Sequence, residues 1–137
     1  MSDGADQALA IANLKARYCR AADTAAEDVV VARAMFADIF TADFVGDYGY
    51  GLLHGPAAIT DFLCDAIAGG SVWMIHMLHS PRIDIDGDSA TGEWVVTAQS
   101  RRRETGEISL VLGRYADVFQ HGEDGWRIAR ITFSRPV

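Results

Sequence analysis

The second half of the chain alternates apolar and polar residues with the two-residue period of β-strands. Clusters of Gly, Asp and Glu, which are typical of turns, interrupt the alternation at residues 86–88, 104–106 and 121–125. Because short turns join antiparallel neighbours, we expect a four-stranded meander. Its strands are predicted at residues 72–85, 90–102, 107–120 and 126–135.

The first half of the chain has the longer period of amphipathic helices. A first helix is predicted at residues 6–22, where one apolar stripe is formed by Ile11, Leu14, Tyr18 and Ala22. Thr24 and Glu27 have the spacing of a capping box, which predicts that a second helix begins there and ends near Phe40. The apolar residues of that second helix are Val30, Val31, Ala34, Met35 and Phe36.

A short glycine-containing hairpin is expected at residues 43–54, and a third helix follows it. That helix begins at Gly55-Pro56 and ends at Gly69-Gly70. Its inner stripe is predicted to be Ile59, Phe62, Leu63, Ala66 and Ile67. Helices followed by strands, with no linker or repeat, predict a single α+β domain over residues 1–137 with the helices on one face of the sheet.

One predicted strand, at residues 72–85, is apolar on both faces, so we expect both faces to be covered. Side chains alternate along a strand, which places His76 on the face of Val72, Met74 and Leu78, opposite to His79. A polar ring on a covered face must find a partner or line a wet cavity. His76 is therefore the first candidate for chemistry.

Composition narrows the class of protein. The 137 residues have a net charge of −7, which argues against a nucleic-acid or membrane-surface partner. The basic run 101–103 is interpreted as a solvated strand end. Cys19 and Cys64 fall inside predicted helices and are expected to be buried thiols in a reducing compartment. The N-terminus shows no apolar leader and no apolar run reaches transmembrane length, so we expect a soluble, cytoplasmic protein.

The order and spacing of several short segments resemble the SnoaL-like families of the nuclear-transport-factor-2-like superfamily. These segments are Arg17-Tyr18-Cys19-Arg20-Ala21-Ala22-Asp23, His54-Gly55-Pro56, His76-Met77-Leu78-His79-Ser80-Pro81, residues 86–94, Gly113-Arg114-Tyr115-Ala116-Asp117 and Asp124-Gly125-Trp126-Arg127-Ile128. The resemblance implies a cone, in which a curved mixed sheet wraps around three helices and stays open at one end.

Within that superfamily the site residues resemble those of bile-acid 7α-dehydratase and, more distantly, scytalone dehydratase. Such enzymes carry a tyrosine and an aspartate on and just after the first helix, a histidine on the first long strand and, in the bile-acid type, an arginine near the end of the last strand. The matching residues are Tyr18, Asp23, His76 and Arg135. Where the bile-acid type has a second aspartate, this chain has Ala98.

The resemblance implies roles for the matching residues. His76 would be the general base, Asp23 would orient it and hold its protonated form, and Tyr18 would polarise a substrate oxygen. Each residue also has a structural interpretation: a core histidine, an exposed turn acid and a core aromatic. Arg135 would bind an anionic group, or it is a solvated terminal charge. Secondary candidates for substrate binding are Tyr48, Tyr115, Asp117 and Trp73.

The predicted function is a cofactor-independent lyase or isomerase of the dehydratase type, acting on a small, mostly apolar, oxygenated molecule. No metal is expected, because His76 and His79 face opposite sides of their strand. One alternative is a non-catalytic ligand-binding or dimerisation module, which Ala98 fits; another is an aldol-type polyketide cyclase. We expect a homodimer or homotrimer formed through apolar residues of the outer sheet face, with candidates Trp73, Ile75, Met77 and Trp94.

Overall fold

The computed structural model describes residues 4–136 as three helices and one six-stranded sheet. The expectation about an N-terminal leader therefore falls partly on residues 1–3, outside the described chain. The elements are α1 (Gly4–Thr24), α2 (Val29–Phe36), β1 (Phe40–Asp47), β2 (Leu52–His54), α3 (Gly55–Gly70), β3 (Ser71–Asp86), β4 (Ser89–Arg102), β5 (Ile108–Gly122) and β6 (Gly125–Ser134).

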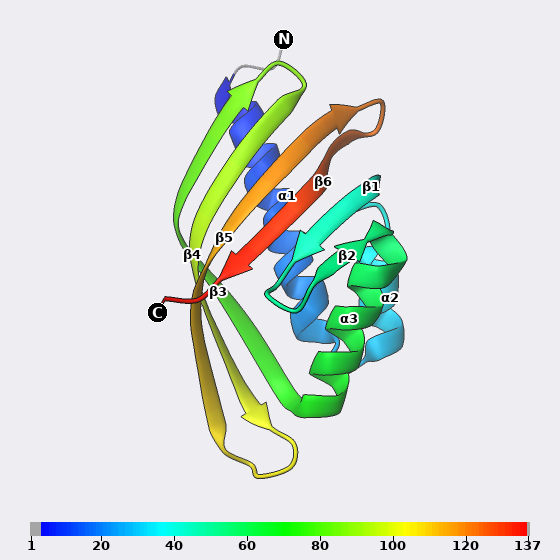
Figure 1. Ribbon diagram of the computed structural model, residues 1–137, viewed down its shortest axis with the longest axis vertical. Coiled ribbons are helices and arrows are strands. Elements are labelled where there is room, and N and C mark those ends of the chain that lie inside the picture. The colour runs from blue at the N-terminus through cyan, green and yellow to red at the C-terminus, as the bar shows by residue number, and fades with distance from the viewer. Residues whose placement is uncertain (1–3, 137) are drawn as a thin grey trace.

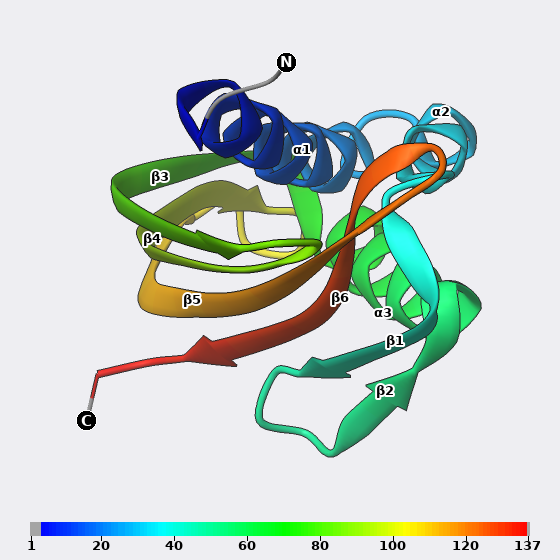
Figure 2. The ribbon, with the colours of Figure 1, turned by 90° about the horizontal axis from the view of Figure 1, so that it is seen from above.

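The sheet is mixed and strongly curved (Figure 1). Its strand order is β2-β1-β6-β5-β4-β3, with β1 parallel to β6 and every other pair antiparallel. Seen from above, the sheet curls so that its edge strands lie on opposite sides of the molecule, and α1 lies across the curl (Figure 2). The predicted cone of sheet around three helices, and the four-stranded meander within it, are confirmed.

The core lies between α1, α3 and the concave face of the sheet. The predicted stripe of α1 is confirmed, since Ile11, Leu14, Tyr18 and Ala22 are all buried. On α3 the buried stripe is Ile59, Leu63, Cys64 and Ile67, whereas Ala66 is exposed. The expectation that both cysteines are buried free thiols is confirmed.

The second helix begins later than predicted. Thr24 belongs to the last turn of α1, where its hydroxyl donates to the carbonyl of Arg20 at 2.8 Å. Asp28 is the true N-cap of α2, because its Oδ1 accepts the backbone N–H of Val31 at 3.1 Å. The capping box at Thr24 is therefore wrong. Of the apolar residues predicted for this helix only Phe36 is buried, and Val30 is 75% exposed; the buried face consists of Ala32 and Phe36.

The convex face of the sheet is not covered by any described part of the chain. Ile75 on β3 and Leu110 and Leu112 on β5 are more than half exposed there. The expectation that both faces of the strand at 72–85 are covered is therefore wrong for the single chain. Val72 is also exposed, because a β-bulge between Ser71 and Trp73 breaks the alternation that would place it beside His76.

The prediction that Trp94 belongs to the outer sheet face is wrong. Trp94 lies on the concave face and is only 4% exposed. Its ring meets Phe119 edge to face. Gly92 makes room for it: a Cβ at that position would lie 2.7 Å from the indole. The two inward-facing aromatics fill the end of the core away from α3.

No helix within residues 4–136 is long and apolar enough to cross a membrane.

Candidate acid–base site in the concave pocket

A carboxylate on α1 and an imidazole on β3 meet at the edge of the concave face. Asp23 Oδ1 lies 2.6 Å from His76 Nδ1 and also accepts the backbone N–H of His76 at 3.0 Å. Their side chains are 22% and 10% exposed, respectively. The two residues are 53 positions apart in the chain, so only the packing of α1 on β3 brings them together.

This contact fixes how the imidazole can act. A carboxylate accepts hydrogen bonds, so Nδ1 carries the proton that faces Asp23. In the neutral ring Nε2 then holds the free lone pair, and His76 lines the pocket. The two contacts of Asp23, one to the ring and one to the backbone N–H, also hold the imidazole in one orientation. The pair therefore has the arrangement of a general base with its orienting acid.

The pocket beside His76 has a volume of about 160 Å³ and mostly apolar walls. The sheet supplies its floor, while α3 and the segment after β1 supply the opposite wall. Ala98 lies directly across from His76 on the neighbouring strand, so no second acid stands there. The lining residues are Tyr48, Leu63, Ile67, Met74, His76, Val96, Ala98, Val111, Tyr115 and Phe133.

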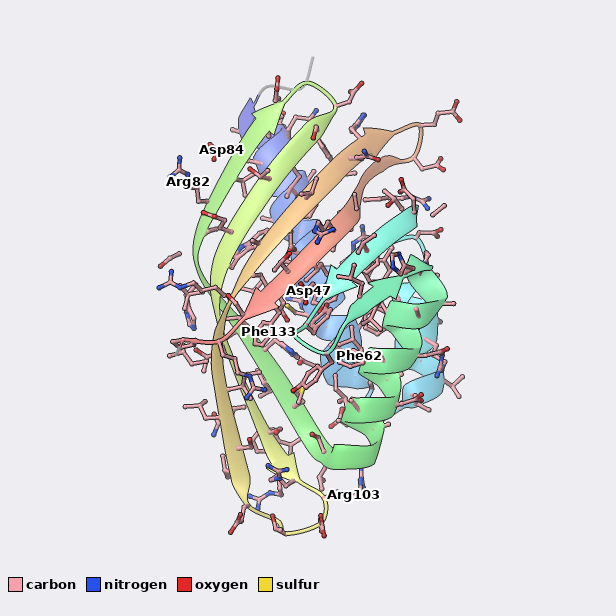
Figure 3. The ribbon with its side chains drawn as sticks, in the orientation of Figure 1. Asp47, Phe62, Arg82, Asp84, Arg103 and Phe133 are labelled. Atoms are coloured by element: carbon pink, nitrogen blue, oxygen red, sulfur yellow. The ribbon has the colours of Figure 1, made fainter. Side chains whose placement is uncertain are left out.

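Phe133 is a wall of this pocket that sequence reasoning missed. Figure 3 shows it on β6, at the side where Phe62 projects from α3. A Cβ on Gly113 would lie 2.5 Å from the Phe133 ring, so the glycine lets the ring lie flat on β5. Phe133 pairs with Tyr115 and its ring reaches over Gly113, a contact that depends on a strand register that the sequence does not state.

Two tyrosines line the pocket and a third supports them. Tyr48 and Tyr115 are pocket residues, whereas Tyr18 is completely buried and is not among the lining residues. The Tyr18 hydroxyl lies 2.5 Å from that of Tyr48, and its ring meets that of Tyr115 edge to face. Burial raises the pKa of all three phenols, so they remain neutral hydrogen-bond donors.

A second ion pair lies behind the tyrosines. Lys15 Nζ and Asp117 Oδ2 are 2.7 Å apart, and both side chains are fully buried. Burial raises the pKa of Asp117 from 3.8 to about 6, against the opposing effect of the Lys15 charge. Asp117 lies on the inner face of β5 but does not line the pocket, although it was predicted to bind substrate. Its partner Lys15 was not predicted; the signal was a single lysine on the apolar side of the first helix.

Arg135 and Trp73, like Asp117, are predicted binding residues that do not line the pocket. Arg135 is exposed and lines a separate, open hollow of about 500 Å³ that has Tyr48 and Phe133 in common with the pocket. Trp73 pairs with Arg101 on β4 and is not a lining residue, because strand alternation turns it away from His76. His79 faces outward as well, with Nε2 at 3.4 Å from the Thr97 hydroxyl.

Comparison with known proteins agrees with this architecture. Residues 4–132 match the family of SnoaL-like domains. A putative aromatic ring hydroxylase from Novosphingobium aromaticivorans is 26% identical, with a TM-score of 0.83 over 99% of this chain and 93% of the other. A putative scytalone dehydratase from the same species is 19% identical, with a TM-score of 0.80 over 95% and 84%.

A hexachlorocyclohexane dehydrochlorinase, LinA-type3 from Novosphingobium barchaimii, is 17% identical, with a TM-score of 0.81 over 95% of this chain and 86% of the other. Among curated proteins, human SH3 and PX domain-containing protein 2A is 36% identical over 62 residues. That match covers 41% of this chain and 6% of the human protein, so the chain spans only a small part of that relative.

Proposed function

Because this chain belongs to the family of SnoaL-like domains, we propose that it is a cofactor-independent lyase of the dehydratase type. The observation that carries the proposal is the contact of 2.6 Å between Asp23 and His76 at the wall of an apolar pocket. Solved structures of the same fold include proteins described as a dehydratase and a dehydrochlorinase, and both names denote eliminations.

The reaction would be a β-elimination. His76 Nε2 takes the proton from a carbon next to a carbonyl, and the C–H electron pair becomes the new carbon–carbon double bond. The Tyr48 hydroxyl donates a hydrogen bond to the carbonyl oxygen as negative charge builds there. The bond to a β-hydroxyl then breaks, and the imidazolium returns its proton to the departing oxygen to give water. Since Ala98 removes any second acid, His76 would serve in both proton transfers.

The pocket volume indicates the size of the substrate. A cavity of about 150 Å³ with apolar walls holds one benzene ring, and this pocket measures about 160 Å³. We therefore expect a single six-membered ring that carries one or two oxygen atoms. A four-ring steroid would not fit unless Phe133 and Tyr48 moved apart.

A panel of cyclic β-hydroxy ketones tests the proposal, because loss of water yields a conjugated enone with a strong ultraviolet absorption. The wild-type protein should convert single-ring members faster than two-ring members, and His76→Gln should remove the activity. A wild-type protein that binds these ketones without converting any of them would favour the ligand-binding module. Formation of a new carbon–carbon bond from an open-chain diketone would favour the aldol-type cyclase.

The exposed convex face supports a further proposal, that two or more copies of the chain associate. Ile75 on β3 and Leu110 and Leu112 on β5 lie on this face and are 51–66% exposed, with Gln99 and Thr97 of β4 between the two strands. Apolar side chains gathered on one face are typical of an interface between proteins. Leu110→Lys should shift the sedimentation coefficient towards that of a monomer. An unchanged sedimentation profile in the variant would contradict self-association through this face.

A further inference from the structure

The proposed reaction leaves one buried ion pair, Lys15 and Asp117, without a role. Lys15 lies on α1 between the tyrosines and the far end of the core, with no exposed surface. Burial of an ammonium group is costly unless it is paired, and a core position on a helix ordinarily carries an apolar residue. The position of Lys15 therefore calls for a function of the charge itself.

The ammonium group lies on aromatic rings as well as beside a carboxylate. Lys15 Nζ is 3.6 Å from the centre of the Tyr115 ring and 4.1 Å from the centre of the Tyr18 ring. The Trp94 ring is at 5.8 Å. Asp117 Oδ2, at 2.7 Å, supplies the opposite charge. Both tyrosine rings are thus in cation–π contact with a single buried cation.

Both rings lead to the pocket. Tyr115 lines it directly, and Tyr18 reaches it through the contact of its hydroxyl with the hydroxyl of Tyr48. On the inward face of β5, Asp117 is the next residue after Tyr115. The residues of β5 that line the pocket are Val111 and Tyr115. Along β5 the acid therefore lies beyond the tyrosine as seen from the pocket, and the cation lies against the tyrosine rings.

We propose that Lys15 is a positioning residue whose buried charge polarises Tyr18 and Tyr115, so that the pocket phenols Tyr48 and Tyr115 favour a negatively charged oxygen on the ligand. A cation over a phenol ring withdraws electron density and strengthens the O–H group as a donor. In a site with little water such a fixed charge acts over a longer distance than at the surface. The inference rests on the proposed function, because it assigns the source of the stabilisation that the developing oxyanion needs.

The test uses p-nitrophenol as the probe, since its neutral and ionised forms absorb at different wavelengths. The affinity of the protein for each form is measured as a function of pH, and the ratio of the two affinities reports the preference for an oxyanion. The wild-type protein should bind the ionised form more tightly. The variant Lys15→Met/Asp117→Leu should lower that ratio about tenfold, equivalent to one pKa unit of the bound probe.

The paired variant is chosen because it removes both charges together. Replacing a buried ion pair by apolar residues of similar size is often neutral for stability, so a change in the ratio would not follow from unfolding. Should this variant fail to fold, Lys15→Gln/Asp117→Asn provides a neutral, hydrogen-bonding pair for the same measurement. In a Tyr48→Phe background the effect of the pair should shrink, because one phenol that transmits it is gone.

The matched control is Arg33→Met/Asp61→Leu, which removes an ion pair of 2.6 Å on the surface of α2 and α3. This control should leave the ratio unchanged. A preference for the ionised probe that survives Lys15→Met/Asp117→Leu would overturn the inference but not the proposed function. A wild-type protein that binds both forms equally would also overturn it. Binding of neither form would overturn the pocket assignment, and with it the inference, whereas loss of elimination in His76→Gln is measured independently.

Discussion

Two close pairs between a carboxylate and a nitrogen tie α1 to the sheet, and they differ in their access to solvent. Asp23 and His76 are 2.6 Å apart at the pocket wall, with side chains 22% and 10% exposed. Asp117 and Lys15 are 2.7 Å apart with no exposure. Each pair joins α1 to a long strand of the sheet. The two distances are nearly equal, so the pairs differ mainly in what surrounds them.

The difference in exposure determines which chemical role each pair can have. In the first pair His76 lines the pocket and only its Nδ1 is engaged by Asp23, so the second ring nitrogen is left for proton transfer. The second pair is enclosed by aromatic rings and has no path for a ligand, so it can only supply a fixed charge. The same core therefore holds a pair suited to proton transfer, Asp23 and His76, and a sealed ion pair, Lys15 and Asp117.

Replacing His76 in the pair with Asp23 should have the largest effect on turnover. His76→Gln should lower the turnover of the best ketone substrate by about 10²–10⁴ while the fold is retained. The matched control is His79→Gln, a histidine on the same strand that faces outward and should leave turnover unchanged. Initial rates and circular dichroism check both variants. Equal activity of His76→Gln and the wild type would remove His76 from the mechanism.

Replacing Lys15 alone should have its largest effect on stability, because it breaks the buried ion pair from one side. Lys15→Met leaves Asp117 buried without its partner, and loss of one member of a buried pair destabilises by about 3–5 kcal/mol. Urea unfolding above neutral pH measures this. The single variant Arg33→Met, at an exposed pair, should change stability little. A small loss in Lys15→Met would show that water reaches Asp117.

The stability of the protein should depend on pH through Asp117. The pKa of Asp117 is raised to about 6 in the folded state, so its protonated form is favoured by folding. This contribution is complete below the ordinary pKa of 3.8 and is lost as the pH rises through 6. Relative to Asp117→Asn, the wild type should therefore gain on the order of 2–3 kcal/mol between pH 7 and pH 4. Parallel unfolding curves for the two proteins would contradict this assignment.

The smallest expected effect is that of replacing Asp23, the partner of His76. Asp23→Asn retains an oxygen that can accept the backbone N–H of His76 but removes the charge that stabilises the imidazolium. Turnover should fall about 10- to 100-fold with little change in KM, because the lost charge acts mainly in the transition state. Steady-state kinetics at one pH separates the two constants. A rise in KM alone would indicate that Asp23 only shapes the pocket.

Local pattern identified most of the elements. The helical stripe of α1 and the turn signals after β3, β4 and β5 were sufficient for the helices and the meander. Thr24 was misread because a capping box and the last turn of a helix look alike in sequence; Asp28 became the cap when α1 continued through Thr24. Trp94 was assigned to the wrong face because the alternation of β4 does not say which set of side chains faces the helices.

His76, Asp23 and Tyr18 were nominated by residue type and by resemblance, and their chemistry was fixed by the sequence. Which groups meet was decided only by the tertiary structure. Packing of α1 against the curved sheet brought Asp23 to His76, put Tyr48 rather than Tyr18 at the pocket, and sealed Lys15 beside Asp117. The physical reason is that spacing along a chain determines the face of one helix or strand, whereas contacts between elements depend on strand register, bulges and curvature. Those features arise from the packing of the whole core.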